Sequence, residues 1–119
     1  MTDRQQRPAE KGERDIVSYM IHNLIQNGYE VRGWNGKSGT TWTTNAPAIL
    51  DYVLDLDEAY IYVRNKETHE ERGFVFLVFG NSPQELIADY SVSIESILTP
   101  TFKYIKSFYD NTYILPEER

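Results

Sequence analysis

Apolar side chains recur at helical spacing near the start of the chain, which predicts a helix over about 13–27 that ends at Asn27-Gly28, because glycine readily adopts the left-handed conformation of a helix end. A second helix is predicted over about 46–56, with Asn45 as N-cap and Pro47 in its first turn. The buried face of the first helix would carry Ile16, Val17, Met20, Ile21, Leu24 and Ile25, and that of the second Ile49, Leu50, Val53 and Leu54.

Segments 29–34, 40–44, 59–65 and 73–80 have the apolar, β-branched and aromatic content of strands. The first two flank Asn35-Gly36, which predicts a hairpin with Lys37 at its tip, an irregular loop being the alternative. The last two are apolar on both faces and predict central strands joined by a charged turn.

Ser82-Pro83-Gln84-Glu85 has the pattern of a capping box and predicts a short helix that runs to about Asp89. An apolar helical stripe then spans residues 94–109 and continues across Pro100. This proline either kinks one long helix or starts a second helix capped by Thr99.

The resulting order, α-β-β-α-β-β-α-α, predicts a single small α+β domain over 13–115. We expect three or four mainly antiparallel strands with helices packed on them. Residues 1–12 are polar and predict a disordered arm, and 116–119 predict a short polar tail.

Composition favours a cytoplasmic protein, because the 119 residues contain no cysteine. No apolar run approaches the ~20 residues of a membrane span, so we expect neither a signal peptide nor an anchor. The net charge is −6, and residues 16–119 hold 8 basic against 14 acidic side chains. Such a domain repels a phosphate backbone at long range and favours basic partners.

The segment GKSGTT at 36–41 resembles a phosphate-binding loop, but Val31 occupies the position of the required first glycine. Strand-forming residues also follow where a helix should begin. Nucleotide hydrolysis is therefore disfavoured. What remains is contact with an anion or acidic surface through Arg32 and Lys37, or simply a solvated turn.

Residues 61–65 (IYVRN) and 72–79 (RGFVFLVF) resemble the two strand motifs of RNA recognition motif domains, with Val75 and Leu77 departing from the usual residues. The resemblance implies that Tyr62, Phe74 and Phe76 would stack bases, with Arg72 near the backbone. In that family a helix and a strand separate the motifs, whereas only residues 66–72 do so here.

Asp51, Asp55, Asp57 and Glu58 gather around the end of the second predicted helix, where like charges and the helix dipole are both unfavourable. This group could serve a basic partner or a hard cation, or could be solvated beside Arg or Lys. We expect no resident metal and no cofactor.

The leading hypothesis is a non-catalytic domain that binds a basic protein partner, with a homo-oligomer as a further option. Its contact residues would be the acidic group Asp51, Asp55, Asp57 and Glu58 and the hairpin residues Trp34, Lys37 and Trp42.

The alternative is single-stranded nucleic acid, bound through Tyr62, Arg64, Arg72, Phe74 and Phe76. An enzyme ranks third, because no nucleophile and base are paired in the sequence. The sequence favours core burial of Tyr62, Phe74 and Phe76, beneath the last helix; if they are instead open, nucleic acid would move to first place.

Overall fold

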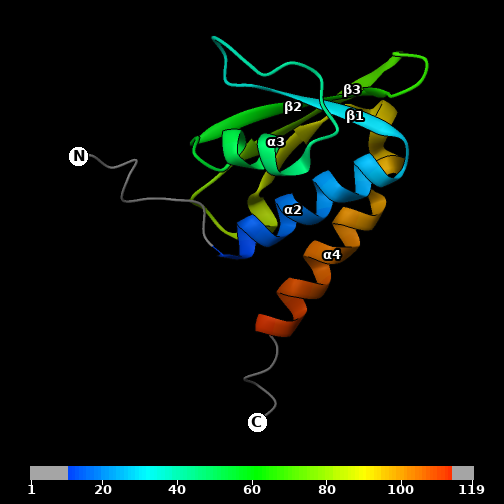
Figure 1. Ribbon diagram of the computed structural model, residues 1–119. Helices are drawn as coiled ribbons and strands as arrows, with labels where there is room; N and C mark the ends of the chain where they lie inside the picture. The colour runs from blue at the N-terminus through cyan, green and yellow to red at the C-terminus, as the bar shows by residue number, and fades with distance from the viewer. Residues whose placement is uncertain (1–10, 114–119) are drawn as a thin grey trace.

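The computed structural model describes residues 11–113, which form a four-stranded antiparallel sheet, three α-helices and two short 3-10 turns (Figure 1). The predicted α+β class is confirmed. None of the helices in this range has the combination of length and apolar character needed to cross a bilayer. The elements are α2 (Lys11–Gln26), β1 (Tyr29–Trp34), α3 (Ala46–Val53), β2 (Glu58–Asn65), β3 (Glu71–Val78), η1 (Pro83–Glu85), β4 (Ile87–Tyr90), η2 (Val92–Ile94) and α4 (Glu95–Tyr113).

The predicted polar arm is two residues too long at its C-terminal end, because Lys11 and Gly12 belong to α2. The rest of the arm, and the tail 116–119, lie outside the described residues. One reason for the earlier start is Glu13, which is fully buried and accepts a hydrogen bond of 2.8 Å from the Gly80 backbone N–H just beyond β3. This contact ties the first turn of α2 to the sheet.

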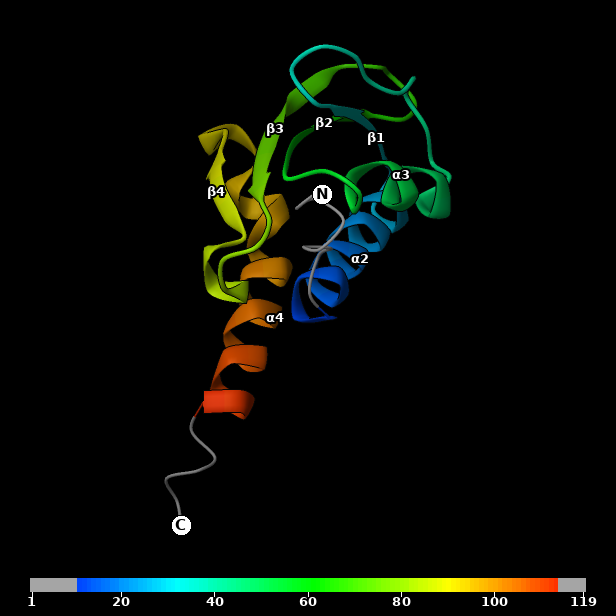
Figure 2. The same cartoon turned by 90° about the vertical axis from the view of Figure 1, so that its left-hand side faces the viewer.

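The sheet has the order β1-β2-β3-β4, so each strand pairs with its neighbour in the chain. Because side chains alternate along a strand, this register divides them between two faces. One face lies against the helices, and all three helices are on that side (Figures 1 and 2). Its fully buried residues are Val31, Ala59, Ile61, Val63, Val75 and Leu77.

Helix α3 begins as predicted: the Asn45 side chain accepts a hydrogen bond from Ala48 N–H, and a proline lies in the first turn. It ends at Val53 rather than near residue 56. Ile49 and Val53 are fully buried and hold the helix against α2 and β1.

The helix predicted from Ser82 to Asp89 is wrong. The Ser82 side chain makes no capping hydrogen bond, and only the 3-10 turn η1 forms before the chain becomes β4. The reason is tertiary: β3 would otherwise have an unpaired edge. Val78 N–H donates to Leu86 C=O, and Val75 and Phe76 pair with Tyr90 and Asp89. Ladder bonds and the burial of Leu86 outweigh a local helix signal.

Helix α4 is a single helix with Pro100 inside it, so the alternative of a second helix starting there is not realised. Ile94 just before it, and Leu98 and Ile105 within it, are buried, and Phe102 contacts the Tyr90 ring at a centroid distance of 5.2 Å. Packing of this stripe on α2, and of Phe102 on Tyr90 of β4, maintains the helix despite the missing N–H.

Two matched substitutions on β3 test which face of the sheet is covered. We expect Val75→Ala to lower the free energy of unfolding by about 2 kcal/mol, because it removes fully buried methyl groups and leaves a cavity. Val78→Ala, on the half-buried opposite face, should cost less than about 1 kcal/mol. Equal losses in denaturant titrations of the two variants would contradict this assignment of the faces.

Candidate functional site

The sheet face turned away from the helices is the candidate functional site, called the open face below. No helix or strand of residues 11–113 lies over it (Figure 2). The register places on it Glu30, Arg32 and Trp34 from β1, Glu58, Tyr60, Tyr62 and Arg64 from β2, Glu71, Phe74, Phe76 and Val78 from β3, and Asp89 from β4.

Four aromatic rings form the centre of the open face. Tyr60 and Phe76 are cross-strand partners, with ring centroids 4.5 Å apart, and Tyr60 also lies 6.1 Å from Tyr62 and 5.8 Å from Phe74. All four side chains are half-buried, largely by one another and by their neighbours on the sheet. The expectation that Tyr62, Phe74 and Phe76 are core residues beneath the last helix is therefore wrong. Because successive side chains of a strand point to opposite faces of the sheet, these three aromatic side chains point toward solvent. Ile61, Val63 and Val75 point the other way and fill the core.

The face predicted for nucleic acid is only partly assembled. Tyr62, Arg64, Phe74 and Phe76 do share the open face, but Arg72 does not join them. Its guanidinium lies 5.9 Å from the ring centroid of Tyr29, and Nη1 donates to the Tyr29 hydroxyl at 3.4 Å. The cause is the register shift between Val63 and Arg64, which sets Glu71 opposite Arg64 and turns Arg72 to the other side of the sheet.

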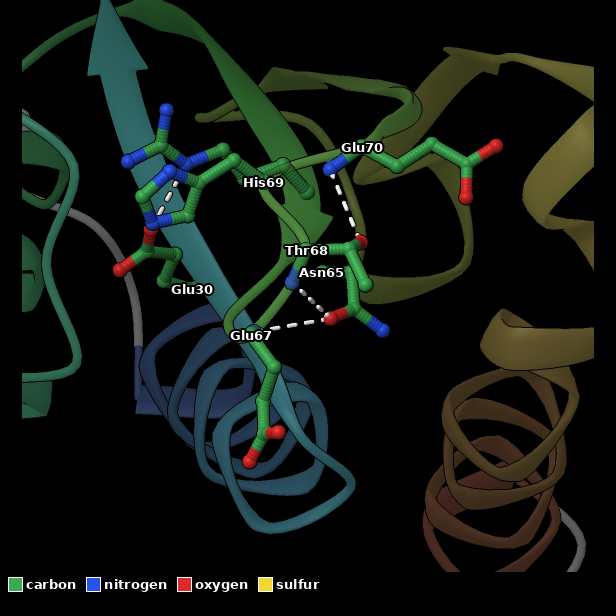
Figure 3. Close-up of polar contacts among 7 residues, drawn as sticks. Glu30, Asn65, Glu67, Thr68, His69 and Glu70 are labelled. Atoms are coloured by element: carbon green, nitrogen blue, oxygen red, sulfur yellow. Dashed lines mark hydrogen bonds and ion pairs between the residues drawn. The ribbon is translucent and has the colours of Figure 1, made fainter.

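Charges on the open face are mixed and mostly acidic. Arg64 Nε donates to Glu30 Oε2 at 2.6 Å, which pairs one of the two arginines of this face. His69 Nε2, from the β2–β3 turn, lies 3.9 Å from the same carboxylate oxygen (Figure 3). Glu58, Glu71 and Asp89 lie at the rim and are exposed. The face therefore offers no continuous positive track.

The β2–β3 turn that presents His69 is built around Asn65, whose side-chain oxygen accepts from the backbone N–H groups of Glu67 and Thr68 (Figure 3). His69 then adopts a left-handed conformation with φ 66°, and its N–H donates to Asn65 C=O. The charged side chains of this turn are exposed.

The segment after β1 forms an irregular loop, the loop 35–45, and the strand predicted over 40–44 is wrong. Trp34 bridges Gly39 and Val31 bridges Thr43, both antiparallel. The two bridges are out of register by one residue, so no continuous ladder can form. Thr40 explains part of this irregularity, because its hydroxyl accepts from Gly33 N–H and its carbonyl accepts from Arg32 Nε at 3.1 Å.

The chain reversal predicted at Asn35-Gly36 is present. Asn35 Oδ1 accepts from the N–H groups of Lys37 and Ser38, and Gly36 has φ 98°. Lys37 is exposed at the tip. The loop continues to α3, which begins only at Ala46, so the glycine-rich turn does not lead directly into a helix as a phosphate-binding loop does.

Helix α3 pins this loop to the sheet. The Tyr52 hydroxyl donates to Ser38 C=O at 2.9 Å, and the Tyr52 ring packs directly over Gly33 in β1. A Cβ at Gly33 would lie 2.8 Å from that ring, so only glycine fits there without displacement.

The two tryptophans that flank the reversal do come together, at a hollow on the open face. It has a volume of about 380 Å³ and is lined by Arg32, Trp34, Trp42, Tyr62 and Glu71. Arg32 lies over the Trp34 ring, 5.6 Å from its centroid, and Arg64 lies 4.4 Å from that of Trp42. Sequence reasoning missed Tyr60 and Glu71. Alternation with Tyr62 was a usable signal for Tyr60, whereas Glu71 reaches this face only through the register shift between Val63 and Arg64.

The acidic group does not converge on one point. Asp51 and Asp55 line a hollow of about 190 Å³ beside Arg14, with Leu50 and Leu54. Glu58 instead lies on the open face, at the start of β2. Within the described part of the chain, no group of three or more His, Asp or Glu side chains is arranged to hold a metal ion.

A conservative substitution tests how the loop is held. We expect Tyr52→Phe to lower the free energy of unfolding by about 1 kcal/mol, because it removes the hydrogen bond to Ser38. Amide exchange at Thr40 and Thr43 should also become faster, since both amides bond to β1. Tyr62→Phe, which leaves the loop contacts in place, is the matched control. Unchanged exchange in Tyr52→Phe would show that α3 does not hold the loop.

Comparisons of the chain with protein-family models, with curated proteins and with solved structures found no match.

Proposed function

We propose that the protein is a non-catalytic binding domain that contacts a protein partner through the open face of its sheet. The observation that carries this proposal is the cluster of Tyr60, Tyr62, Phe74 and Phe76, which are half-buried although no helix covers them. Aromatic side chains on a rigid surface bury a large area at low entropic cost, and they are enriched at the energetic centres of protein interfaces.

Charge supports a protein partner over a nucleic acid. An open aromatic face alone would favour base stacking. This face, however, is surrounded by five groups, four of which are carboxylates and the fifth an arginine paired with one of them. Arg64 is paired with Glu30, and Glu58, Glu71 and Asp89 stand at the rim. Polynucleotide affinity depends on neutralising phosphates with lysine and arginine, which this face does not provide in excess. A partner with an apolar centre and a basic rim fits it better.

A second copy of the chain is one partner that would satisfy these requirements. The open face carries both signs of charge, with arginines toward β1 and β2 and Asp89 on β4. Two such faces packed about a two-fold axis can therefore place opposite charges together. Concentration-dependent light scattering distinguishes this homo-oligomer from a different partner.

We also propose a cytoplasmic location for this contact. The absence of cysteine from the whole sequence supports a reducing compartment, because small domains in oxidising compartments often rely on disulfides. Net acidic charge is compatible with basic partners in that compartment.

The test of the proposal compares two surfaces of the immobilised protein. We expect Phe76→Ser to reduce retention of a bound partner about tenfold or more, because Phe76 lies at the centre of the aromatic cluster. Tyr19→Ser is the matched control, since Tyr19 is an exposed aromatic on α2, on the other side of the sheet. Equal retention by Phe76→Ser and Tyr19→Ser would overturn the assignment to the open face.

The triple variant Asp51→Asn, Asp55→Asn and Asp57→Asn tests the acidic group separately. These residues lie in and just after α3, away from the aromatic cluster. We expect a smaller effect than that of Phe76→Ser, visible mainly as a weaker salt dependence of binding. A loss larger than that of Phe76→Ser would move the contact surface to α3.

Single-stranded nucleic acid remains the second candidate function, because Tyr62, Phe74 and Phe76 are open as that function requires. We expect no mobility shift of a labelled single-stranded oligonucleotide at low salt, owing to the carboxylates on the face. A shift that declines with added salt and with Phe76→Ala would instead put nucleic acid first.

A further inference from the structure

The hollow beside the aromatic cluster has the features of a small-ligand site. Its volume of about 380 Å³ lies within the range of known ligand pockets. Three of its five lining residues are aromatic, namely Trp34, Trp42 and Tyr62, and the other two are Arg32 and Glu71. The site is thus lined by aromatic side chains, one cationic side chain and one anionic side chain.

Both charged groups have hydrogen-bonding capacity to spare. Arg32 uses Nε to donate to Thr40 C=O, and across residues 11–113 its two terminal nitrogens have no hydrogen-bond acceptor. Glu71 is exposed, and its carboxylate makes no hydrogen bond or ion pair with the described residues. A ligand can therefore gain a pair of donors from Arg32 and a pair of acceptors from Glu71.

The charge balance disfavours a cationic ligand. One face of each tryptophan already has a guanidinium near it, Arg32 at Trp34 and Arg64 at Trp42. A further cation would enter beside these two arginines, and the lining residues themselves sum to no net charge. The chemistry instead suits a neutral planar ring that stacks on indole and phenol surfaces.

Guanine combines these requirements in one neutral ring. Its O6 and N7 atoms form the acceptor pair that arginine binds in bidentate fashion, and its N1–H and N2 amino groups form a donor pair suited to one carboxylate. Adenine, cytosine and uracil lack this combination, because none presents an adjacent donor pair on one edge and an adjacent acceptor pair on another.

We propose that the hollow between Trp34, Trp42 and Tyr62 binds a guanine base, with Glu71 accepting from N1–H and the N2 amino group and Arg32 donating to O6 and N7. This site goes beyond the protein contact proposed above and does not depend on it. The base can come from a free nucleoside or nucleotide, or from a single strand.

The walls of this site are held in place before any ligand arrives. Arg32 is fixed by Thr40, and the loop that carries Trp42 is attached to β1 at Val31 and to α3 through Ser38. Trp34 and Tyr62 stand on neighbouring strands. Preorganisation of this kind lowers the entropic cost of binding.

The chain suits a direct test, because its only two tryptophans, Trp34 and Trp42, both line the hollow. Their two indole N–H signals in a nitrogen–proton correlation spectrum therefore report on this site and avoid interference from absorption by the base. Titration with guanosine should shift both signals in a saturable manner. The affinity for adenosine should be at least about tenfold lower than that for guanosine.

Two analogues and two variants test the individual contacts. Inosine lacks the N2 amino group, and 7-deazaguanosine lacks the N7 acceptor, so each should bind several-fold more weakly than guanosine. Glu71→Gln should lose most of the preference for guanosine over inosine. Arg32→Gln should lose most of the preference for guanosine over 7-deazaguanosine. Glu58→Gln, on the same face but outside the hollow, is the matched control and should change neither.

Three results would overturn the site: no saturable indole shift with guanosine, equal affinity for adenosine, or equal effects of Glu71→Gln and Glu58→Gln. Guanosine monophosphate and an oligonucleotide with one guanine separate the sources of the base. We expect the strand to bind more weakly than the nucleoside, because carboxylates border the face; tighter binding would identify a strand as the source. Partner capture sensitive to Phe76→Ser but not to Glu71→Gln would keep the proposed function intact if the guanine site fails.

Discussion

The burial of one face of the sheet beneath α2, α3 and α4 is the constraint on which the other features depend. Val31, Ile61, Val75 and Leu77 point to that side and are fully buried. Because side chains alternate along 59–63 of β2 and 73–77 of β3, fixing these residues in the core forces Tyr60, Tyr62, Phe74 and Phe76 to the opposite side. The aromatic surface is therefore a direct consequence of core packing. Its rings reduce their exposure by contacting one another and their neighbours on the sheet.

Local patterns predicted those elements that also bury an apolar face of their own. Helix α2, strands β1, β2 and β3, and the N-cap of α3 follow from periodicity and from residues such as Asn45. Patterns failed where a distant strand decided the outcome. The segment after Pro83 has a good local helix signal, yet it becomes β4 because the edge of β3 requires a partner. The segment after Gly39 has strand-forming residues, yet a one-residue slip against β1 prevents a ladder.

The candidate site was predictable in its residue types more than in its arrangement. Trp34, Trp42 and Tyr62 attract notice in the sequence, but nothing local shows that a loop brings them to one hollow. Apolar residues at consecutive positions in 59–63 of β2 and 74–78 of β3 concealed which set faces the helices. Arg72 illustrates the remaining difficulty, since a single bulge turns it from the expected face toward Tyr29. Bulges depend on pairing geometry that a single sequence does not display.

The order of strands in the sheet also has a consequence for how the chain folds. Each strand pairs with the strand that precedes or follows it, so the sheet can grow by successive local steps with little loop-closure entropy. Contacts between α2 and α4 are different, because they join the two ends of the described chain. During synthesis from the N-terminus, α2 can pack on β1 and α3 early, but the part of its apolar side that contacts α4 must wait for nearly the whole domain to emerge. Until α4 docks, the side of the sheet that is finally buried is itself partly exposed, and the molecule briefly presents two apolar surfaces instead of one.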